Sequence, residues 1–343
     1  MVLAGGVGSR FWPVSTPRRP KQILPLASER PLIVDTVERI LPLIPLDRVR
    51  ILTGRELVAP ILEALPGLDG RHFLVEPRAR GTGPVLVWAA HHIARTRADA
   101  IMVSLHADHV IRPEAVFREL MASAFVAAAE HDRLFTIGIR PVRAETGYGY
   151  IRRGRALDDA GAWSVDAFVE KPDAETAARY VDSGDYVWNS GIFVWRADRL
   201  LAEVRSHAPE LAALLPLLDR GEVAAFFERA PVLSIDHGVL ERSGRVGVID
   251  ATFGWDDVGT WDAVARARPA DERGNVTIGD GRLVDSEGCV VWNEADGPVV
   301  VFGARDLVVV RVHGVTLVLP RDRAAFLKDL LAELPEEVRE VQP

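Results

Sequence analysis

The chain has 343 residues, of which 48% are hydrophobic and 26% are charged, and its formal net charge is −8. This composition is typical of a globular protein, and the acidic balance without a basic stripe argues against nucleic acid as a partner. No apolar run approaches the ~20 residues that span a bilayer, and the N-terminus lacks the basic start and apolar core of a signal peptide, so we expect no membrane partner.

Short apolar runs alternate with longer helical patterns through the first two thirds of the chain. The runs predicted as buried strands are 2–4, 50–53, 72–75, 100–105 and 134–139. The segments predicted as helices are 33–41, 56–65, 84–96 and 114–130. This alternation predicts an α/β fold with a Rossmann-like, doubly wound mixed sheet. In such sheets ligands bind outside the carboxyl ends of the strands, which is where functional residues are sought.

The pattern changes in the last quarter of the chain. Short β-type runs split by turn residues extend over 274–320, and an amphipathic helix is predicted over 321–334. We therefore expect a main domain over residues 1–268 and a small β-rich, β-helix-like domain over residues 269–343. The one cysteine, Cys289, lies in an apolar run of this tail. It cannot form an internal disulfide, and its setting predicts a buried structural residue in a cytoplasmic protein.

The tail is too short to build a large core of its own, yet it is rich in β-type apolar sequence. We therefore expect it to mediate self-association, with a homodimer as the predicted assembly. A module that only caps the main domain is the simpler alternative.

A glycine-rich loop follows the first predicted strand. It reads Gly5-Gly6-Val7-Gly8-Ser9-Arg10. Its spacing matches neither a dinucleotide fingerprint nor a P-loop. Glycines allow backbone N–H groups to approach phosphate oxygens, and Arg10 can add a two-pronged grip, so the loop predicts an anion site. A plain glycine turn is the simpler interpretation of the loop taken alone.

Lysine is rare in this chain, because only Lys21, Lys171 and Lys328 stand among its 41 basic residues. A lysine kept where arginine is the default cation indicates a need for a compact ammonium, with chance as the alternative. Lys21 lies in a loop that four prolines stiffen. A lysine beside a phosphate cradle suits triphosphate chemistry.

A carboxylate follows the strand predicted over 100–105, in Ser104-Leu105-His106-Ala107-Asp108-His109. At the carboxyl end of a strand, Asp108 is well placed to hold Mg²⁺ on a triphosphate, with a turn or N-cap aspartate as the alternative. His106 and His109 raise the question of a transition-metal site. We interpret them as loop histidines, because the sequence offers no matching third ligand nearby.

These motifs resemble one enzyme family in the same order. Residues 5–17 and Pro20-Lys21-Gln22 are similar to the signature of sugar-nucleotide pyrophosphorylases, and Phe11-Trp12-Pro13 resembles the mannose-1-phosphate guanylyltransferases among them. The resemblance covers about residues 1–268 and, more loosely, the tail. It implies an Mg²⁺-dependent enzyme that forms GDP-mannose and pyrophosphate from GTP and mannose 1-phosphate.

The resemblance also implies which residues form the site. The residues implied in catalysis are Arg10 and Lys21. The residues implied in nucleotide binding are Gly5, Gly6, Gly8, Ser9, Glu76, Arg80, Thr82 and Asp108. The residues implied in sugar-phosphate binding are Gly149, Glu170, Lys171 and Asn189. The metal ligands implied are Asp108 and Asp257, the latter in a turn between Trp255 and Trp261.

Four positions depart from the family pattern. His106 stands where proline is usual, and Gly81 and Gly83 stand where asparagine and alanine are usual. Arg242 stands where a lysine is common, and we leave it as a possible cation without a role.

Three alternatives to the guanylyltransferase reading stay open at this point. One is a nucleotidylyltransferase that uses UTP or dTTP with glucose 1-phosphate. Another is a non-catalytic sugar-nucleotide-binding homologue, and a third is a glycosyltransferase of similar fold. The presence of both Lys21 and the two aspartates, Asp108 and Asp257, favours an enzyme.

Overall fold

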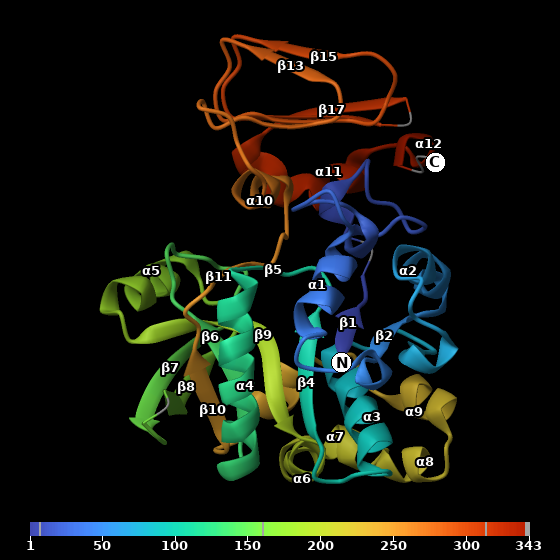
Figure 1. Ribbon diagram of the computed structural model, residues 1–343, viewed down its shortest axis with the longest axis vertical. Helices are drawn as coiled ribbons and strands as arrows, with labels where there is room; N and C mark the ends of the chain where they lie inside the picture. Colours follow the sequence, from blue (N-terminus) through green and yellow to red (C-terminus); the bar gives the residue numbers. More distant parts are fainter. Residues whose placement is uncertain (7, 160, 313, 340–343) are drawn as a thin grey trace.

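The computed structural model describes residues 1–6, 8–159, 161–312 and 314–339. A large α/β part lies below a smaller β-rich module in Figure 1, and helices α10 (Trp261–Ala267) and α11 (Leu327–Glu333) lie between them. The predicted class, an α/β main part with a C-terminal β-rich part, is confirmed.

One mixed sheet forms the main part, with the strand order β3-β2-β1-β4-β9-β6-β10-β8-β7. Strands β1 to β4 run parallel, whereas β9 runs antiparallel to both of its central neighbours, β4 and β6. The strands are β1 (Val2–Ala4), β2 (Ile51–Gly54), β3 (Phe73–Glu76), β4 (Ile101–His106), β6 (Leu134–Ile139), β7 (Tyr150–Ala156), β8 (Ala162–Val169), β9 (Tyr186–Arg196) and β10 (Val246–Asp250). The carboxyl ends of β1, β2, β3 and β4 therefore meet at one edge, where ligands bind in such sheets.

Helices cover both faces of this sheet, as strand β9 shows by its alternation. Phe193 and Trp195 pack among residues of α3 and α6, while Ile192 and Val194 pack among residues of α4. The helices are α1 (Leu32–Ile40), α2 (Val58–Ala64), α3 (Thr82–Ala94), α4 (Glu114–Glu130), α5 (Ala174–Ser183), α6 (Ala197–His207), α7 (Pro209–Ala212), α8 (Leu215–Asp219), α9 (Val223–Arg229) and the π-helix η6 (Asp236–Leu240). No helix in the described part of the chain is long and apolar enough to cross a membrane.

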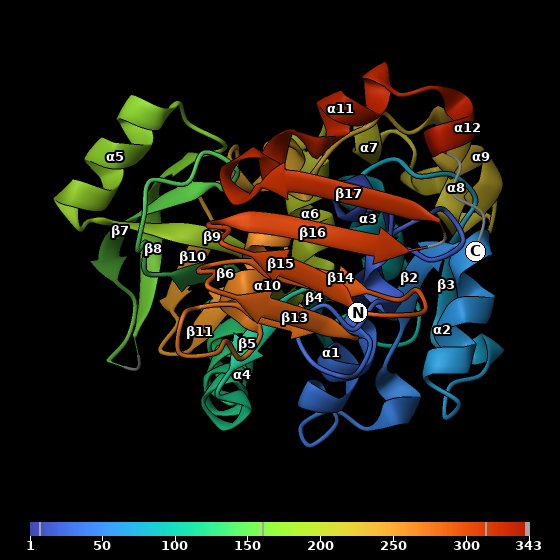
Figure 2. The same ribbon diagram turned by 90° about the horizontal axis from the view of Figure 1, so that it is seen from above.

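The C-terminal module consists mainly of short parallel strands. Its strands form one group in the order β12-β14-β16-β17 and a second pair, β13-β15, and only β16 and β17 are antiparallel. From above, β16 and β17 run side by side over the main part (Figure 2). The strands are β12 (Val276–Ile278), β13 (Gly281–Val284), β14 (Val290–Asn293), β15 (Val299–Phe302), β16 (Leu307–Val312) and β17 (Val315–Pro320).

Tight corners let these strands stack. At Gly279, where φ is +81°, an added Cβ would lie 1.9 Å from the Asn293 carbonyl oxygen, so only glycine fits this turn. Cys289 is buried, as predicted from its apolar setting.

The final helix differs from its prediction. The segment predicted as one helix over 321–334 begins as a 3-10 helix, Arg321–Phe326, and becomes α-helical only in α11. Its buried residues, Ala324 and Leu327, are three apart. That spacing matches the three residues per turn of a 3-10 helix, and an apolar pattern this short does not distinguish the two helix types.

An aromatic cluster joins the module to the glycine loop. Trp261 on α10 packs edge-on against Phe11 at 5.4 Å and against Trp292 on β14 at 5.5 Å, and all three side chains are fully buried. Each such pair contributes roughly 0.5–1.5 kcal/mol beyond the burial of its apolar area. The Trp261 Nε1–H also donates to the Trp12 carbonyl at 3.4 Å. The module is therefore docked directly on the segment that follows the glycine-rich loop.

Candidate active site

Two adjoining cavities lie at the carboxyl edge of the main sheet. The larger, of about 1070 Å³, lies between this edge and the C-terminal module, and the smaller, of about 410 Å³, lies over β9. The residues that line both are Gly147, Tyr148, Lys171 and Asp257. The two spaces therefore form one continuous cleft, and most of the predicted site residues lie in or beside it.

Lys21 and Gln22 contact the glycine loop and hold its conformation. The Lys21 stem packs so closely on Gly8 that a Cβ there would lie 2.7 Å from the Lys21 Cβ. The buried Gln22 amide donates to the carbonyls of Gly5 and Gly6, the latter at 3.1 Å. This explains two requirements of the motif, because Gly8 must lack a side chain and Gln22 must carry an amide. Ser9 begins a short 3-10 turn directly after Gly8.

Arg10 is an uncommitted cation. It is exposed, it lines the larger cavity, and it makes no hydrogen bond or ion pair with any other described residue. A guanidinium in this position is free to bind an anion that enters the cleft.

Lys21 and Asp108 form the ion pair at the centre of the site. The Lys21 ammonium lies 2.6 Å from a carboxylate oxygen of Asp108, and both side chains are largely buried. Burial would raise the pKa of Asp108, but the charge of the Lys21 ammonium outweighs burial and lowers the pKa to about 2. The carboxylate is therefore ionised throughout the physiological range.

Asp108 supplies a third group beside the two histidines, between which it stands in the sequence. Ligand atoms of His106, Asp108 and His109 lie within 4.8 Å of one another, so the premise that no third ligand stands nearby is wrong. Asp108 is thus a candidate ligand for a transition metal as well as for Mg²⁺. Burial lowers the pKa of both histidines, which keeps them neutral.

The two histidines nevertheless differ in what they offer. The Trp255 indole N–H donates to His109 Nδ1 at 3.2 Å, which leaves the proton of the neutral ring on Nε2 and no free lone pair for a metal. His106 stacks on His109 at 4.7 Å and has no hydrogen bond to another described residue. Of the cluster, His106 and Asp108 therefore keep accessible ligand atoms.

Asp257 faces the same centre from the other side of the cleft. Burial, the main cause, together with Asp256 and Asp108 raises its pKa, while a 2.7 Å hydrogen bond from the Tyr148 hydroxyl and the charge of Lys21 oppose the rise. Asp108 and Asp257 thus both lie close enough to the Lys21 ammonium to be stabilised by it. Mg²⁺ prefers oxygen ligands and is usually bound by one or two carboxylates. The carboxylates of Asp108 and Asp257 therefore fit that ion.

The smaller cavity is lined by hydrogen-bonding groups whose positions are fixed. Gly149 allows Glu170 to approach, because a Cβ there would lie 2.5 Å from a Glu170 carboxylate oxygen. The Asn189 amide accepts from Thr136 at 2.8 Å and donates to Asp236 at 2.8 Å. Three of the predicted sugar-side residues, Gly149, Glu170 and Asn189, therefore lie together.

Asp236 is a further residue of the smaller cavity that was not predicted from the sequence. Burial, the main cause, and the nearby Glu170 carboxylate raise the pKa of Asp236 to about 6. The residue begins the π-helix η6, which brings it beside Asn189 from 47 positions away. No local motif marks it, although π-helical turns often occur at functional sites.

Lys171 connects the two cavities. Its ammonium lies 2.6 Å from Glu170, its side chain is 62% exposed, and its backbone has φ +48°, which is rare outside glycine. The Lys171 N–H donates to the Tyr148 carbonyl at 3.2 Å and fixes this conformation. Lys171, with its ammonium paired to Glu170, therefore lines both cavities.

Glu76 and Arg80, two of the residues predicted to bind the nucleotide, have different surroundings. Glu76, at the end of β3, lies beside Gly5, and burial together with Glu56 raises its pKa to about 7. Arg80 instead donates to the carbonyls of Phe227 and Glu228 at 2.9 and 2.8 Å. The structure thus brings Glu76 to the glycine loop but commits most of the Arg80 guanidinium to α9.

The unusual glycines near Thr82 have a packing reason. A Cβ on Gly81 or Gly83 would lie 2.7 or 2.8 Å from the Leu233 carbonyl oxygen. The Thr82 hydroxyl accepts from the Ile235 N–H at 3.0 Å in the same crossing. The departure from the family pattern therefore accommodates the segment that leads to Asp236. Arg242 lies apart, where it contacts the His207 carbonyl.

A glycine loop, a lysine–aspartate pair and a wall of sugar-type hydrogen-bonding groups at the carboxyl edge of a doubly wound sheet define a nucleotide-transferring protein. Two family models match the chain: nucleotidyl transferase over residues 1–274, and MannoseP isomerase/GMP-like beta-helix domain over residues 281–334. The chain belongs to the nucleotidyl transferase family.

Curated relatives match almost the whole chain. The mannose-1-phosphate guanylyltransferase of Klebsiella pneumoniae is 35% identical over an alignment of 353 positions, which covers 99% of this chain and 74% of that protein. The alginate biosynthesis protein AlgA of Pseudomonas putida is 35% identical over an alignment of 352 positions, which covers 99% of this chain and 72% of that protein.

Solved structures agree on the fold. A protein of Thermus thermophilus, described as a mannose-1-phosphate geranyltransferase, superposes with a TM-score of 0.89 and 35% identity over 97% of each chain. A UDP-glucose pyrophosphorylase complexed with UDP-glucose superposes at 0.52 and 18% identity over 78% of this chain and 95% of that one, which shows a shared fold.

Removal of the Lys21 charge should change the pKa of Asp108. In the variant Lys21→Met, burial acts on Asp108 without its main opposing charge, so the Asp108 pKa should rise from about 2 to above the ordinary value for aspartate. Carboxyl ¹³C NMR measures this directly, with Asp108→Asn to assign the resonance. In the parent, this depressed pKa contributes stability that is complete above the unfolded pKa and is lost as pH falls toward about 2. An unchanged Asp108 pKa in the variant would contradict the pairing.

Proposed function

We propose that this chain forms GDP-mannose and pyrophosphate from GTP and mannose 1-phosphate. The observation that carries the proposal is the continuous cleft, with the Lys21–Asp108 pair on the glycine-loop side and Glu170, Lys171 and Asn189 on the other. The name of the Klebsiella relative, mannose-1-phosphate guanylyltransferase, supports both the sugar phosphate and the base, and the name of the Thermus structure supports mannose 1-phosphate.

In this proposal the glycine loop and its cations receive the triphosphate. Loop N–H groups approach the phosphate oxygens, Lys21 supplies a compact charge, and the unpaired Arg10 closes over the anion. These groups matter most as negative charge moves onto the departing pyrophosphate. Mg²⁺, held by Asp108 and Asp257, would neutralise phosphate charge at the same place.

The sugar phosphate binds in the smaller cavity. Glu170 and Asn189 accept and donate to sugar hydroxyls, and Lys171 holds the phosphate near the junction of the cavities. A phosphate oxygen of the sugar then attacks the α-phosphorus, the new P–O bond forms, and the bond to pyrophosphate breaks with its electron pair on pyrophosphate. The nucleophile is already anionic, so positioning replaces general-base chemistry.

A carboxylate beside the glycine loop supports guanine as the base. Glu76, when ionised, accepts from two adjacent donors, and guanine offers the N1–H and the N2 amino group side by side. Uracil and thymine place carbonyl oxygens on both sides of their single N–H, which a carboxylate would repel. Glu76 thus favours GTP over UTP or dTTP.

The first test is a matrix of substrates. The protein with Mg²⁺ is incubated with each of the four common nucleoside triphosphates against mannose, glucose and N-acetylglucosamine 1-phosphates, and pyrophosphate release is followed. GTP with mannose 1-phosphate should give the highest turnover. Lys21→Ala should lower kcat by roughly 10²–10³, as loss of one electrostatic donor to a transition state does. Higher turnover with UTP or dTTP and glucose 1-phosphate would overturn the assignment, and nucleotide binding without pyrophosphate release would indicate a non-catalytic homologue.

Glu76→Gln tests the reading of the base. The amide cannot accept from both guanine donors, so KM for GTP should rise by about 10- to 100-fold, the loss expected for a hydrogen bond to a charged group. In the parent, KM for GTP should fall as pH rises through about 7, because Glu76 then ionises. Glu56→Gln is the matched variant: it removes a charge that raises the Glu76 pKa, so the midpoint should move to lower pH. A KM for GTP that is equal in Glu76→Gln and parent would remove Glu76 from the base site.

We also propose that residues 269–343 act as a self-association module of a cytoplasmic homodimer, apart from the catalytic residues 1–268. An exposed apolar stripe on the module supports this. Val284 and Phe302 are paired across β13 and β15 and are 53% and 75% exposed, and Val300 nearby is 65% exposed. A second copy of the same surface would cover such a stripe.

Sedimentation at micromolar concentration tests the association. The parent should sediment as a dimer, and Phe302→Glu should shift it to monomer because it places a charge in the stripe. Val126→Glu is the control, since Val126 on α4 is also exposed, at 55%, but lies on the main part. A parent that stays monomeric, or a control variant that dissociates equally, would refute the proposed surface.

A further inference from the structure

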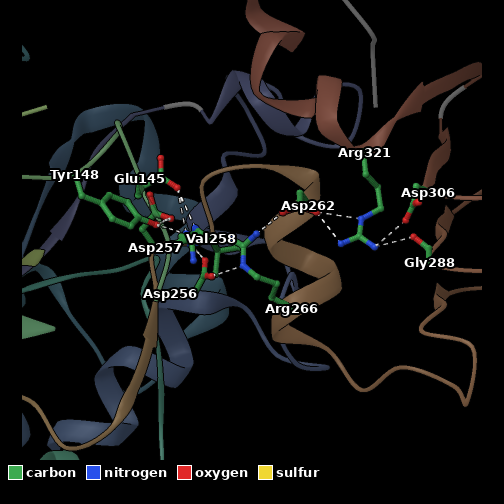
Figure 3. A network of polar contacts seen from close by, with 11 residues as sticks. Glu145, Tyr148, Asp256, Asp257, Val258, Asp262, Arg266, Gly288, Asp306 and Arg321 are labelled. Atoms are coloured by element: carbon green, nitrogen blue, oxygen red, sulfur yellow. Dashed lines mark hydrogen bonds and ion pairs between the residues drawn. The ribbon is translucent and has the colours of Figure 1, made fainter. Parts of the chain in front are cut away.

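A chain of polar contacts connects the turn that carries Asp257 to the C-terminal module. It passes from Asp256 through Arg266 and Asp262 to Arg321, and Figure 3 shows these side chains directed toward one another between the two parts. The proposed function uses Asp257 alone, so it leaves this chain of contacts without a role.

The first contact fixes the backbone beside Asp257. One carboxylate oxygen of Asp256 accepts from the Val258 N–H at 2.9 Å, and the other accepts from Arg266 Nε at 2.8 Å. Val258 is fully buried and has φ +43°. A β-branched residue with this φ is strained and persists only where its surroundings hold it. Asp256 holds the turn in that conformation, and Arg266 holds Asp256.

The next contacts cross to the module. Arg266 also pairs with one carboxylate oxygen of Asp262, and the other oxygen of Asp262 accepts from Arg321 Nη2 and Nε at 2.7 and 3.0 Å. The remaining Nη1 of Arg321 donates to the Gly288 carbonyl at 2.8 Å. One planar guanidinium therefore bridges a main-part carboxylate and the backbone of the module.

These contacts are partly buried: the exposed fractions are 14% for Asp256, 35% for Arg266, 37% for Asp262 and 23% for Arg321. Pairs of this exposure contribute little to stability, and the aromatic cluster of Phe11, Trp261 and Trp292 docks the module independently. Their effect is therefore on position. A residue that supports a metal ligand from behind changes metal affinity without touching the metal.

We propose that Arg321 is a positioning residue, through which the C-terminal module sets the place of Asp257 in the cleft. Asp262 and Arg266 transmit this constraint to Asp256 and so to the strained turn at Val258. The module then has a part in the reaction beyond assembly. The step from turn position to metal binding rests on the proposed function, whereas the hold on the turn does not.

Hydrogen exchange of the full-length protein tests the hold on the turn. Arg321→Gln should speed amide exchange in the peptide that covers 256–260 by about tenfold, since it removes a restraint on a locally strained segment. The matched control is Arg273→Gln, whose ion pair with Asp285 at 3.3 Å also lies in the module but is well exposed and away from the turn. Equal exchange in Arg321→Gln and parent would overturn the proposal.

Metal binding tests the consequence. Mn²⁺ binding followed by EPR, in the presence of GTP, should weaken by about 10- to 100-fold in Arg321→Gln and stay at the parent value in Arg273→Gln. Asp262→Asn should have the same effect, and the double variant should be no worse than Asp262→Asn alone, because both substitutions interrupt the same chain of contacts. Faster exchange with unchanged Mn²⁺ affinity would overturn the positioning role. A parent that releases no pyrophosphate would instead count against the proposed function and leave the exchange result intact.

Discussion

A protein of net charge −8 that binds two phosphate-bearing substrates must hold its cations at defined places, and the ion pair with Asp108 holds the Lys21 ammonium at one of them. Asp108 pairs with Lys21, and Lys21 keeps Asp108 ionised although it is largely buried. The packing of Lys21 on Gly8 and the donation from Gln22 to the loop serve this pair. The contacts with Lys21 and Gln22 therefore help to set the conformation of the glycine loop.

The C-terminal module is connected to both sides of the larger cavity. Trp261 joins it to the glycine-loop side through Phe11, and the polar contacts of Arg321 join it to the turn of Asp257. The C-terminal module therefore supports both the glycine-loop side and the Asp257 side of the larger cavity. In this account the size of the cleft depends on apolar docking, and the place of one carboxylate depends on ion pairs that contribute little stability.

The sequence predicted what local patterns determine. The strand at 134–139 and the helix at 114–130 have the predicted bounds, because burial and helical periodicity act over neighbouring residues. Asp236 could not be found in this way, since its role depends on Asn189, 47 positions away. The reason for Gly81 lies likewise in Leu233. The 3-10 start at Arg321 was missed because its apolar spacing is shared with an α-helix.

Asp108 and Asp257 should act on one metal ion, and anomalous diffraction from crystals with Mn²⁺ and GTP tests this most directly. One peak should contact both carboxylates, with the Lys21 ammonium displaced from Asp108 toward the triphosphate. A peak on His106 and Asp108 without Asp257, or Lys21 still paired with Asp108 while Mn²⁺ is bound elsewhere, would contradict it.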